Sequence, residues 1–303
     1  MKIFFILIFL IGSAVADDVL KTHLVDTEKG GLDRILKERY IRILTTKNAF
    51  DYYIYQGQAK GNQYEMVKKF IKFLNKKYPA KKNQTQIVFE MIPVDYEELI
   101  PMLKEGRGDI IASGMTITEE RNKIIQFAKP YRFVDEVILT RKELASKDWK
   151  QAKFSVRKSS SYFDSLSKAK IEIDVVDEEL HTENIMELIS LGKYQYTVAD
   201  SYLAKNAKKV FKGLVILKDR PFRKKQPIAW GLRKGDKKLL NLVNQFIPAI
   251  KKGTMIGNIL DRKYFRDMGR IRSKDFNLKT STLSRYDHLI KKYAKKFGFD
   301  WRL

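Results

Sequence analysis

Short apolar runs alternate with segments of helical periodicity along most of this chain. Runs at 41–45, 86–92 and 109–112 have the length and composition of buried strands. Between them, 64–78 and 95–103 predict helices, the second one begun by a capping box. This strand–helix rhythm predicts an α/β fold with mostly parallel sheets flanked by helices.

The rhythm starts again after a further apolar run, and this predicts a second lobe inserted into the first. Two long strands, near 137–141 and 226–230, are expected to cross between the lobes. We expect lobe 1 to comprise 39–140 plus 227–265 and lobe 2 to comprise 141–226, with a ligand-binding cleft between them. The second set comprises predicted strands 153–156, 171–176 and 196–199 and predicted helices 162–170 and 183–191.

Both ends of the chain differ from this pattern. Residues 1–16, MKIFFILIFLIGSAVA, predict a secretory signal peptide, because one Lys precedes a short apolar run and a small-residue cleavage site. We expect 17–38 to form a loose N-terminal arm. Residues 266–283 are polar and basic, which is typical of a linker, and 284–303 contain a short amphipathic helix that looks like the start of another domain.

Cysteine and histidine usage excludes several kinds of site. The chain has no Cys, so it has no disulfide, no thiol nucleophile and no lipid-bearing N-terminal Cys. Its three histidines, His23, His181 and His288, lie far apart in the sequence, so we expect no metal site and no cofactor. With the signal peptide, the composition predicts a monomeric periplasmic protein.

The formal charge of +24 is concentrated in the last third of the chain. Residues 188–303 hold 29 Lys+Arg against 8 Asp+Glu, whereas residues 1–187 hold 31 against 28. This asymmetry favours anionic surfaces such as the outer membrane or peptidoglycan. A Lys-rich solvated surface with no binding role explains the composition equally well. Export argues against nucleic acid as the partner.

The segment 108–121 carries the clearest chemical signal. A buried strand leads into the small-residue corner Ser113–Gly114 and then into a helix expected to begin with Thr118 as its N-cap. Such a corner leaves backbone amides beside hydroxyls, and Arg121 follows one helical turn later. A planar fork of donors beside unpaired amides suits a carboxylate. An ordinary capped strand–helix junction remains the alternative.

This segment also resembles the ligand-binding signature of family 3 solute-binding proteins, which capture amino acids in bacterial periplasms. The segments NQYEM (62–66), KSSSY (158–162), VADS (198–201) and PIAWGLRKGD (227–236) resemble other parts of these proteins. The string YYIY (52–55) and the junction YDHLIKKYAKKFGFDWRL (286–303) look like the lytic transglycosylase F type, which fuses such a receptor to a lysozyme-like domain. The resemblance implies a two-lobed, type II periplasmic-binding-protein-like fold.

The resemblance also implies roles for individual residues. Arg121 would bind a ligand carboxylate, helped by the hydroxyl of Thr116 and the backbone around Ser113 and Gly114. From the opposite lobe, Asp200 would bind a ligand amine, although a helix N-cap is its simpler role. Further candidates have plain alternatives in core packing or helix capping; they are Tyr52 and Tyr64 as an aromatic wall and Ser160 and Ser161 as an anion cradle.

The resemblance finally bears on catalysis. Lytic transglycosylases use one catalytic Glu as acid and base, and in the resembled family it follows the FDWRL stretch. Here the last Glu is Glu187, so no catalytic residue is predicted and no transglycosylase activity is expected of this chain. We therefore expect a regulatory module that binds amino-acid-like or stem-peptide (muropeptide) ligands. The alternative is an amino-acid receptor that serves an ABC transporter.

Overall fold

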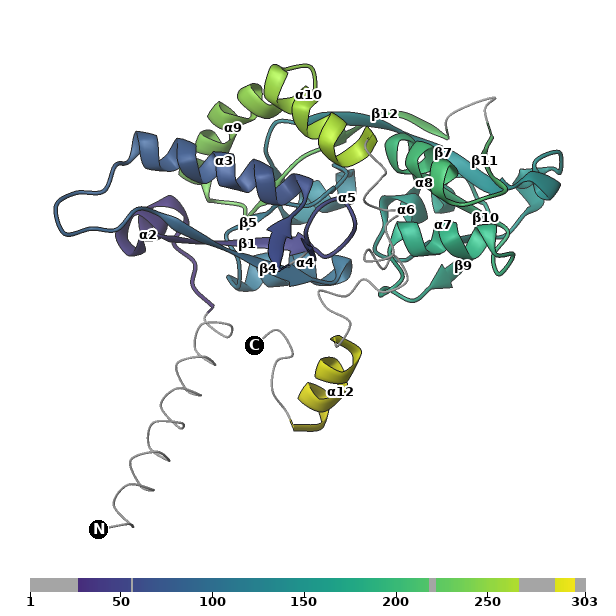
Figure 1. Ribbon diagram of the computed structural model, residues 1–303, viewed down its shortest axis with the longest axis horizontal. Helices are drawn as coiled ribbons and strands as arrows, with labels where there is room; N and C mark the ends of the chain where they lie inside the picture. The colour runs from purple at the N-terminus through teal and green to yellow at the C-terminus, as the bar shows by residue number, and fades with distance from the viewer. Residues whose placement is uncertain (1–26, 56, 218–221, 267–286, 298–303) are drawn as a thin grey trace, which may run out of the picture.

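Two α/β lobes lie side by side, joined by long strands, in a computed structural model of the protein (Figure 1). The structure describes residues 27–55, 57–217, 222–266 and 287–297. The predicted signal peptide and the predicted linker at 266–283, apart from Arg266, lie outside these ranges. Among the described residues, no helix combines the length and apolar character needed to cross a membrane.

Lobe 1 is built on a sheet with the strand order β4-β1-β5-β13-β6. Strand β1 pairs in parallel with β4 and β5, whereas β13 returns antiparallel between β5 and β6. Its strands are β1 (Tyr40–Thr46), β4 (Val88–Val94), β5 (Ile110–Ile111), β6 (Gln126–Phe127) and β13 (Gly231–Leu232), with the hairpin β2 (Tyr53–Tyr55) and β3 (Gln58–Lys60) beside them. Its helices are α2 (Gly31–Glu38), α3 (Asn62–Lys77), the 3-10 helix η1 (Tyr96–Glu98), α4 (Leu99–Glu105), α5 (Glu119–Ile124), α9 (Lys237–Ile250), α10 (Met255–Asp261) and the π-helical turn η4 (Arg262–Arg266).

Lobe 2 is built on a second sheet, ordered β11-β7-β10-β8-β9. Strands β10, β8 and β9 are parallel neighbours, and β7 runs antiparallel to β10 and β11. Its strands are β7 (Arg132–Arg141), β8 (Phe154–Arg157), β9 (Ile173–Val176), β10 (Tyr196–Asp200), β11 (Leu214–Ile216) and β12 (Arg223–Ile228). Its helices are α6 (Ser161–Lys168), α7 (Thr182–Ser190) and α8 (Ser201–Val210), with 3-10 turns η2 (Lys142–Leu144) and η3 (Trp149–Gln151).

Strands β7 and β12 connect the lobes, as the sequence predicted. They pair antiparallel from Arg132 opposite Ile228 to Glu136 opposite Arg223. Figure 1 shows them passing from one lobe to the other along one side of the molecule. The return strands β12 and β13 add antiparallel pairings, so both sheets are mixed rather than mostly parallel.

Aromatic side chains fill the interior of lobe 1. Trp230 is fully buried and lies edge-on to Phe70 at 5.7 Å and stacked on Phe246 at 6.1 Å. The indole N–H of Trp230 donates to Gln63 Oε1 at 2.9 Å, so the only polar atom of this side chain is satisfied. This core fixes α3 and α9 against the sheet of lobe 1, the lobe that supplies one side of the candidate site.

The expectation of a loose arm at 17–38 is wrong for its last part. Helix α2 occupies Gly31–Glu38, and Leu32 and Ile35 are buried in the core of lobe 1. Three apolar residues of this short helix pack on the core, Leu32, Ile35 and the partly buried Leu36, which is a short pattern for a sequence to reveal. Residues 17–26 lie outside the described part of the chain.

The predicted amphipathic helix near the C-terminal end is present as α12 (Asp287–Phe297). It lies apart from both lobes in Figure 1. Its apolar side chains Leu289, Ile290, Tyr293 and Phe297 are exposed.

Candidate ligand-binding site

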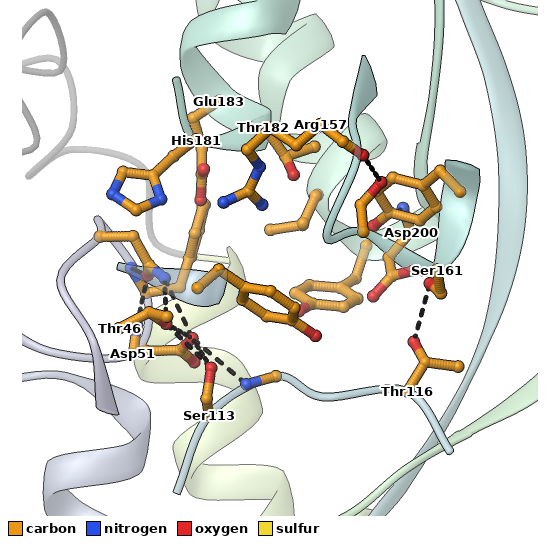
Figure 2. A pocket seen from close by; sticks show the side chains of 18 residues that line it. Thr46, Asp51, Ser113, Thr116, Arg157, Ser161, His181, Thr182, Glu183 and Asp200 are labelled. Atoms are coloured by element: carbon orange, nitrogen blue, oxygen red, sulfur yellow. Dashed lines mark hydrogen bonds between the residues drawn. The ribbon is translucent and has the colours of Figure 1, made fainter. Parts of the chain in front are cut away.

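A cavity of about 60 Å³ lies between the two lobes. It is small, with room for a handful of water molecules at roughly 10–15 Å³ each. Figure 2 shows side chains of both lobes converging on it. Lobe 1 contributes Thr46, Asn48, Phe50, Asp51, Tyr96, Ser113, Gly114 and Thr116, and lobe 2 contributes Arg157, Ser160, Ser161, Tyr162, His181, Thr182, Glu183, Asp200, Tyr202 and Leu203.

Asp51 is the acidic group that lobe 1 presents to the cavity. Its Oδ2 accepts hydrogen bonds from Thr46 Oγ1 at 3.0 Å, Asn48 Nδ2 at 3.0 Å and the Gly114 amide at 3.3 Å. All of these donors are uncharged. A carboxylate of the chain itself therefore occupies part of the corner that the sequence assigned to a ligand carboxylate.

The backbone around Gly61 holds Asp51 in place. Gly61 has φ 133°, and a Cβ there would lie 2.0 Å from the carbonyl oxygen of Asp51. The same carbonyl accepts from the amide of Gln63 at the start of α3. Only glycine allows this close approach of the backbone of Asp51 and Tyr52 to the start of α3.

Asp200 stands at the carboxyl end of β10, where α/β folds bind ligands. It occupies the N-cap position of α8, but its side chain makes no capping hydrogen bond. The residue is 3% exposed, and its Oδ1 has no hydrogen-bond partner among the described residues. The side chain of Asp200 therefore does not cap α8, and its buried Oδ1 remains available to a ligand group.

The pKa of Asp200 is raised to about 7, chiefly by burial and next by the nearby carboxylate of Glu136. Hydrogen bonding with Tyr162 and the charge of Arg132 lower it, and Asp51 raises it. Glu136, fully buried, accepts from Ser165 Oγ at 2.7 Å and has Arg223 at 3.9 Å. A cationic group at Asp200 would remove the penalty for ionising it.

Arg157 is the basic group that lobe 2 presents to the cavity. It ends β8 and is 6% exposed, and its guanidinium lies 5.2 Å from the ring centre of Tyr96. Its Nε and Nη1 find no hydrogen-bond partner in the described part of the chain. Unsatisfied buried donors on a charged group cost free energy, so this arrangement favours an anionic ligand group.

Glu183 adds a second acid from lobe 2. It lies in the first turn of α7, and burial raises its pKa to about 7. The charge of Asp51 contributes to this rise, whereas the Glu183 backbone amide and Arg157 oppose it. The sequence analysis did not identify Arg157, Glu183 or His181 as site residues. Their positions, at a strand end and at the beginning of a helix, were the available signal.

Arg121 takes a different place from the one expected. Thr118 caps α5 as predicted, accepting from the Arg121 amide at 3.2 Å. The guanidinium donates to Thr116 O at 2.7 Å and to Ser159 O, in lobe 2, at 2.9 Å. Arg121 is not among the side chains that line the cavity, so in this arrangement it links the two lobes.

The predicted hydroxyl groups do lie together. Ser161 Oγ donates to Thr116 Oγ1 at 3.3 Å across the lobes, and both line the cavity with Ser113 and Gly114. Ser160 caps α6, its Oγ accepting from the Phe163 amide at 3.3 Å. The capping role of Ser160 is thus present, and an anion-binding role for these serines stays a prediction.

The two predicted wall tyrosines lie elsewhere. Tyr52 and Tyr64 pack against each other with ring centres 6.1 Å apart, and neither lines the cavity. The aromatic lining comes instead from Phe50, Tyr96, Tyr162 and Tyr202. Among the described residues, no group of His, Cys, Asp and Glu is arranged to hold a metal ion.

Comparison with known families agrees with this architecture. Residues 41–267 match the profile of the bacterial extracellular solute-binding proteins, family 3. The chain belongs to this family.

Curated relatives of the family 3 chain are longer proteins. It is 29% identical to a membrane-bound lytic murein transglycosylase F of Desulfosudis oleivorans over 89% of its own length and 59% of that protein. The corresponding protein of Photobacterium profundum is 27% identical over 90% of the chain and 53% of that protein. The chain therefore spans little more than half the length of these relatives.

Solved structures show the same fold. An ancestral amino acid-binding protein, a precursor of cyclohexadienyl dehydratase, matches with a TM-score of 0.64 and 26% identity, over 77% of this chain and 99% of that one. A binding component of an ABC transporter from Wolinella succinogenes, complexed with lysine, matches with a TM-score of 0.64 and 23% identity, over 77% and 99%. The two-lobed type II architecture of periplasmic amino-acid-binding proteins is thereby confirmed.

Proposed function

We propose that this chain binds a small amphoteric ligand, with a free amine and a free carboxylate, between its two lobes. The observation that carries the proposal is the pair of unsatisfied buried groups in one cavity. Asp200 Oδ1 needs a donor and Arg157 needs an acceptor, and neither has one in the described part of the chain. An amino-acid-like group supplies both at once.

The cavity also limits what can enter it. A space of about 60 Å³ favours a small ligand group, and a larger one would require the lobes to open. A peptidoglycan stem peptide would place only its amino-acid end inside. Such ligands carry the free amines and carboxylates that the site requires.

The role we propose is that of a sensing module in the periplasm, associated with the cell wall and the outer membrane. Similarity to proteins named membrane-bound lytic murein transglycosylase F supports this role. Closure of the lobes around a ligand would then signal that cell-wall fragments are present. Arg121, which donates to carbonyl groups of both lobes, would strengthen the closed state or, as the sequence resemblance implies, turn to the ligand carboxylate.

Calorimetric titration tests the proposal. The purified protein is titrated with the twenty amino acids and with a set of defined muropeptides, in parallel with Asp200→Asn and Arg121→Ala. We expect micromolar binding of at least one ligand and a loss of 10-fold or more in the Asp200 variant. If the folded protein binds neither an amino acid nor a muropeptide, the proposal is contradicted.

A transport receptor is the second candidate, supported by the match to nearly the whole length of the ancestral amino acid-binding protein. Binding of a free amino acid without any muropeptide favours this candidate. Deletion of 266–303 provides a further distinction: it should leave ligand delivery to a permease intact and impair coupling to an attached enzyme.

A further inference from the structure

The cavity holds more acidic groups than one ligand amine requires. Asp51, Glu183 and Asp200 all line it, whereas its basic side chains are the guanidinium of Arg157 and the imidazole of His181. In Figure 2, Asp51 and Glu183 lie toward one end of the cavity, Asp200 lies toward the other, and Arg157 reaches in between them. The two ends are therefore separate acidic positions.

Asp51 and Glu183 come from different lobes and face the same space. The hydrogen-bond donors on Asp51 Oδ2 are Thr46, Asn48, Ser113 and the Gly114 amide, none of which carries a charge. Asp51 is also one of the charges that act on Glu183. Two carboxylates brought together by lobe closure repel each other unless one keeps its proton or a cation lies between them.

Arg157 acts on Glu183 only through its charge, which lowers the pKa of that acid. Its Nε and Nη1 make no hydrogen bond to either acid or to any other described residue, although the side chain is 6% exposed. These buried donors point to an anionic ligand group near the middle of the cavity. With these donors turned to such an anion, a second cationic group of the same ligand would balance Asp51 and Glu183.

Resting on the proposed function, we propose that Asp51 and Glu183 form a subsite for a second ammonium group. The ligand is thus a diamino acid: one amine at Asp200, a carboxylate at Arg157, and a second amine between the lobes. Its net positive charge offsets the acid excess of the cavity. A neutral side chain of equal length would leave Asp51 and Glu183 facing each other without compensation.

Matched ligands test this subsite by calorimetry. L-lysine, L-norleucine and Nε-acetyl-L-lysine share a backbone and differ at the side-chain end. We expect L-lysine to bind at least 10-fold tighter than the two uncharged analogues. Glu183→Gln should reduce this preference to less than about 3-fold. Glu187→Gln is the control, because it lies on the same helix and does not line the cavity.

The outcomes separate the two proposals. Equal binding of L-lysine and L-norleucine overturns the second-amine subsite and leaves the amino-acid site standing. A lysine preference that survives in a folded Glu183→Gln protein also overturns it, with the thermal midpoint of each variant as the folding check. If no amino acid and no muropeptide binds, the proposed function falls and the subsite falls with it.

Discussion

Arg157 is the residue whose surroundings say most about the ligand. Its buried guanidinium has unsatisfied donors beside a cavity that the sequence had assigned to a different arginine. We expect Arg157→Ala to weaken ligand binding by about 2–5 kcal/mol, because a desolvated charge pair is lost. Arg157→Lys should recover part of this loss, since it keeps the charge but not the fork of donors.

Calorimetry on the two variants measures this effect. Arg262→Ala serves as the control, because Arg262 is exposed and does not line the cavity. Unchanged affinity in a folded Arg157→Ala protein would show that the guanidinium faces no ligand group. A similar loss in Arg121→Ala would not distinguish contact with the ligand from the loss of its bond to lobe 2.

Asp200 gives the ligand-free protein a defined pH dependence. Its pKa is about 7 when folded and near 3.8 when unfolded, so the folded state holds the proton more tightly. Between these values the folded state binds more protons, and the free energy of unfolding falls as pH rises. From pH 4 to 7 the ionisation of Asp200 should lower the free energy of unfolding by up to about 4 kcal/mol.

Denaturant unfolding at pH 4, 5, 6 and 7 checks this sign. Glu183 contributes in the same direction, so the relevant quantity is wild type minus Asp200→Asn, which removes the Asp200 proton alone. The free energy of unfolding of the wild type should fall relative to that of Asp200→Asn as pH rises. A difference that stays constant with pH would mean that Asp200 is solvated or already paired.

At the scale of elements, the sequence predicted regular structure well and irregular structure poorly. The crossing strand β7 and helices α3 and α7 are confirmed, because each carries a clear apolar pattern. The crossing strand expected near 226–230 is interrupted, since β12 ends at Ile228 and β13 begins at Gly231. Tertiary packing around the buried Trp230 decides that break, and local pattern does not encode it.

The residues of the candidate site also differ in whether the sequence revealed them. The small-residue corner pointed to Ser113 and the family resemblance to Thr116 and Asp200, and all three line the cavity. Neither signal identified Arg157 or Glu183, because the position of each depends on how the lobes close rather than on its neighbours in sequence. Ligand roles for all of these residues remain proposals.

Helix α2 allows a test of an element that the sequence analysis placed in a loose arm. Ile35 is fully buried in the core of lobe 1, so Ile35→Ala should lower the free energy of unfolding by about 2–5 kcal/mol. Lys37→Ala, on the exposed side of the same helix, should change it by less than about 0.5 kcal/mol. Equal, small effects in denaturant unfolding would mean that α2 is not docked in solution.

At the scale of the whole molecule, the charge distribution predicts binding to anionic surfaces. Residues 188–303 hold 29 basic against 8 acidic residues. Anionic phospholipid or peptidoglycan should attract this part, and salt should weaken the attraction because the Debye length falls from about 10 Å at 0.1 M to about 3 Å at 1 M. A solvated lysine surface without a binding role would show no such attraction.

Co-sedimentation with vesicles distinguishes these two explanations of the charge. We expect the protein to pellet with vesicles containing phosphatidylglycerol at 50 mM salt, to be released at 500 mM, and to stay in solution with purely zwitterionic vesicles. The Glu183→Gln variant should pellet as wild type does, because the cavity is separate from the surface charge. Binding that resists salt would mean that apolar contacts, such as the exposed face of α12, dominate instead. No binding at low salt would leave the basic surface without a role and place the function of the chain in its cavity alone.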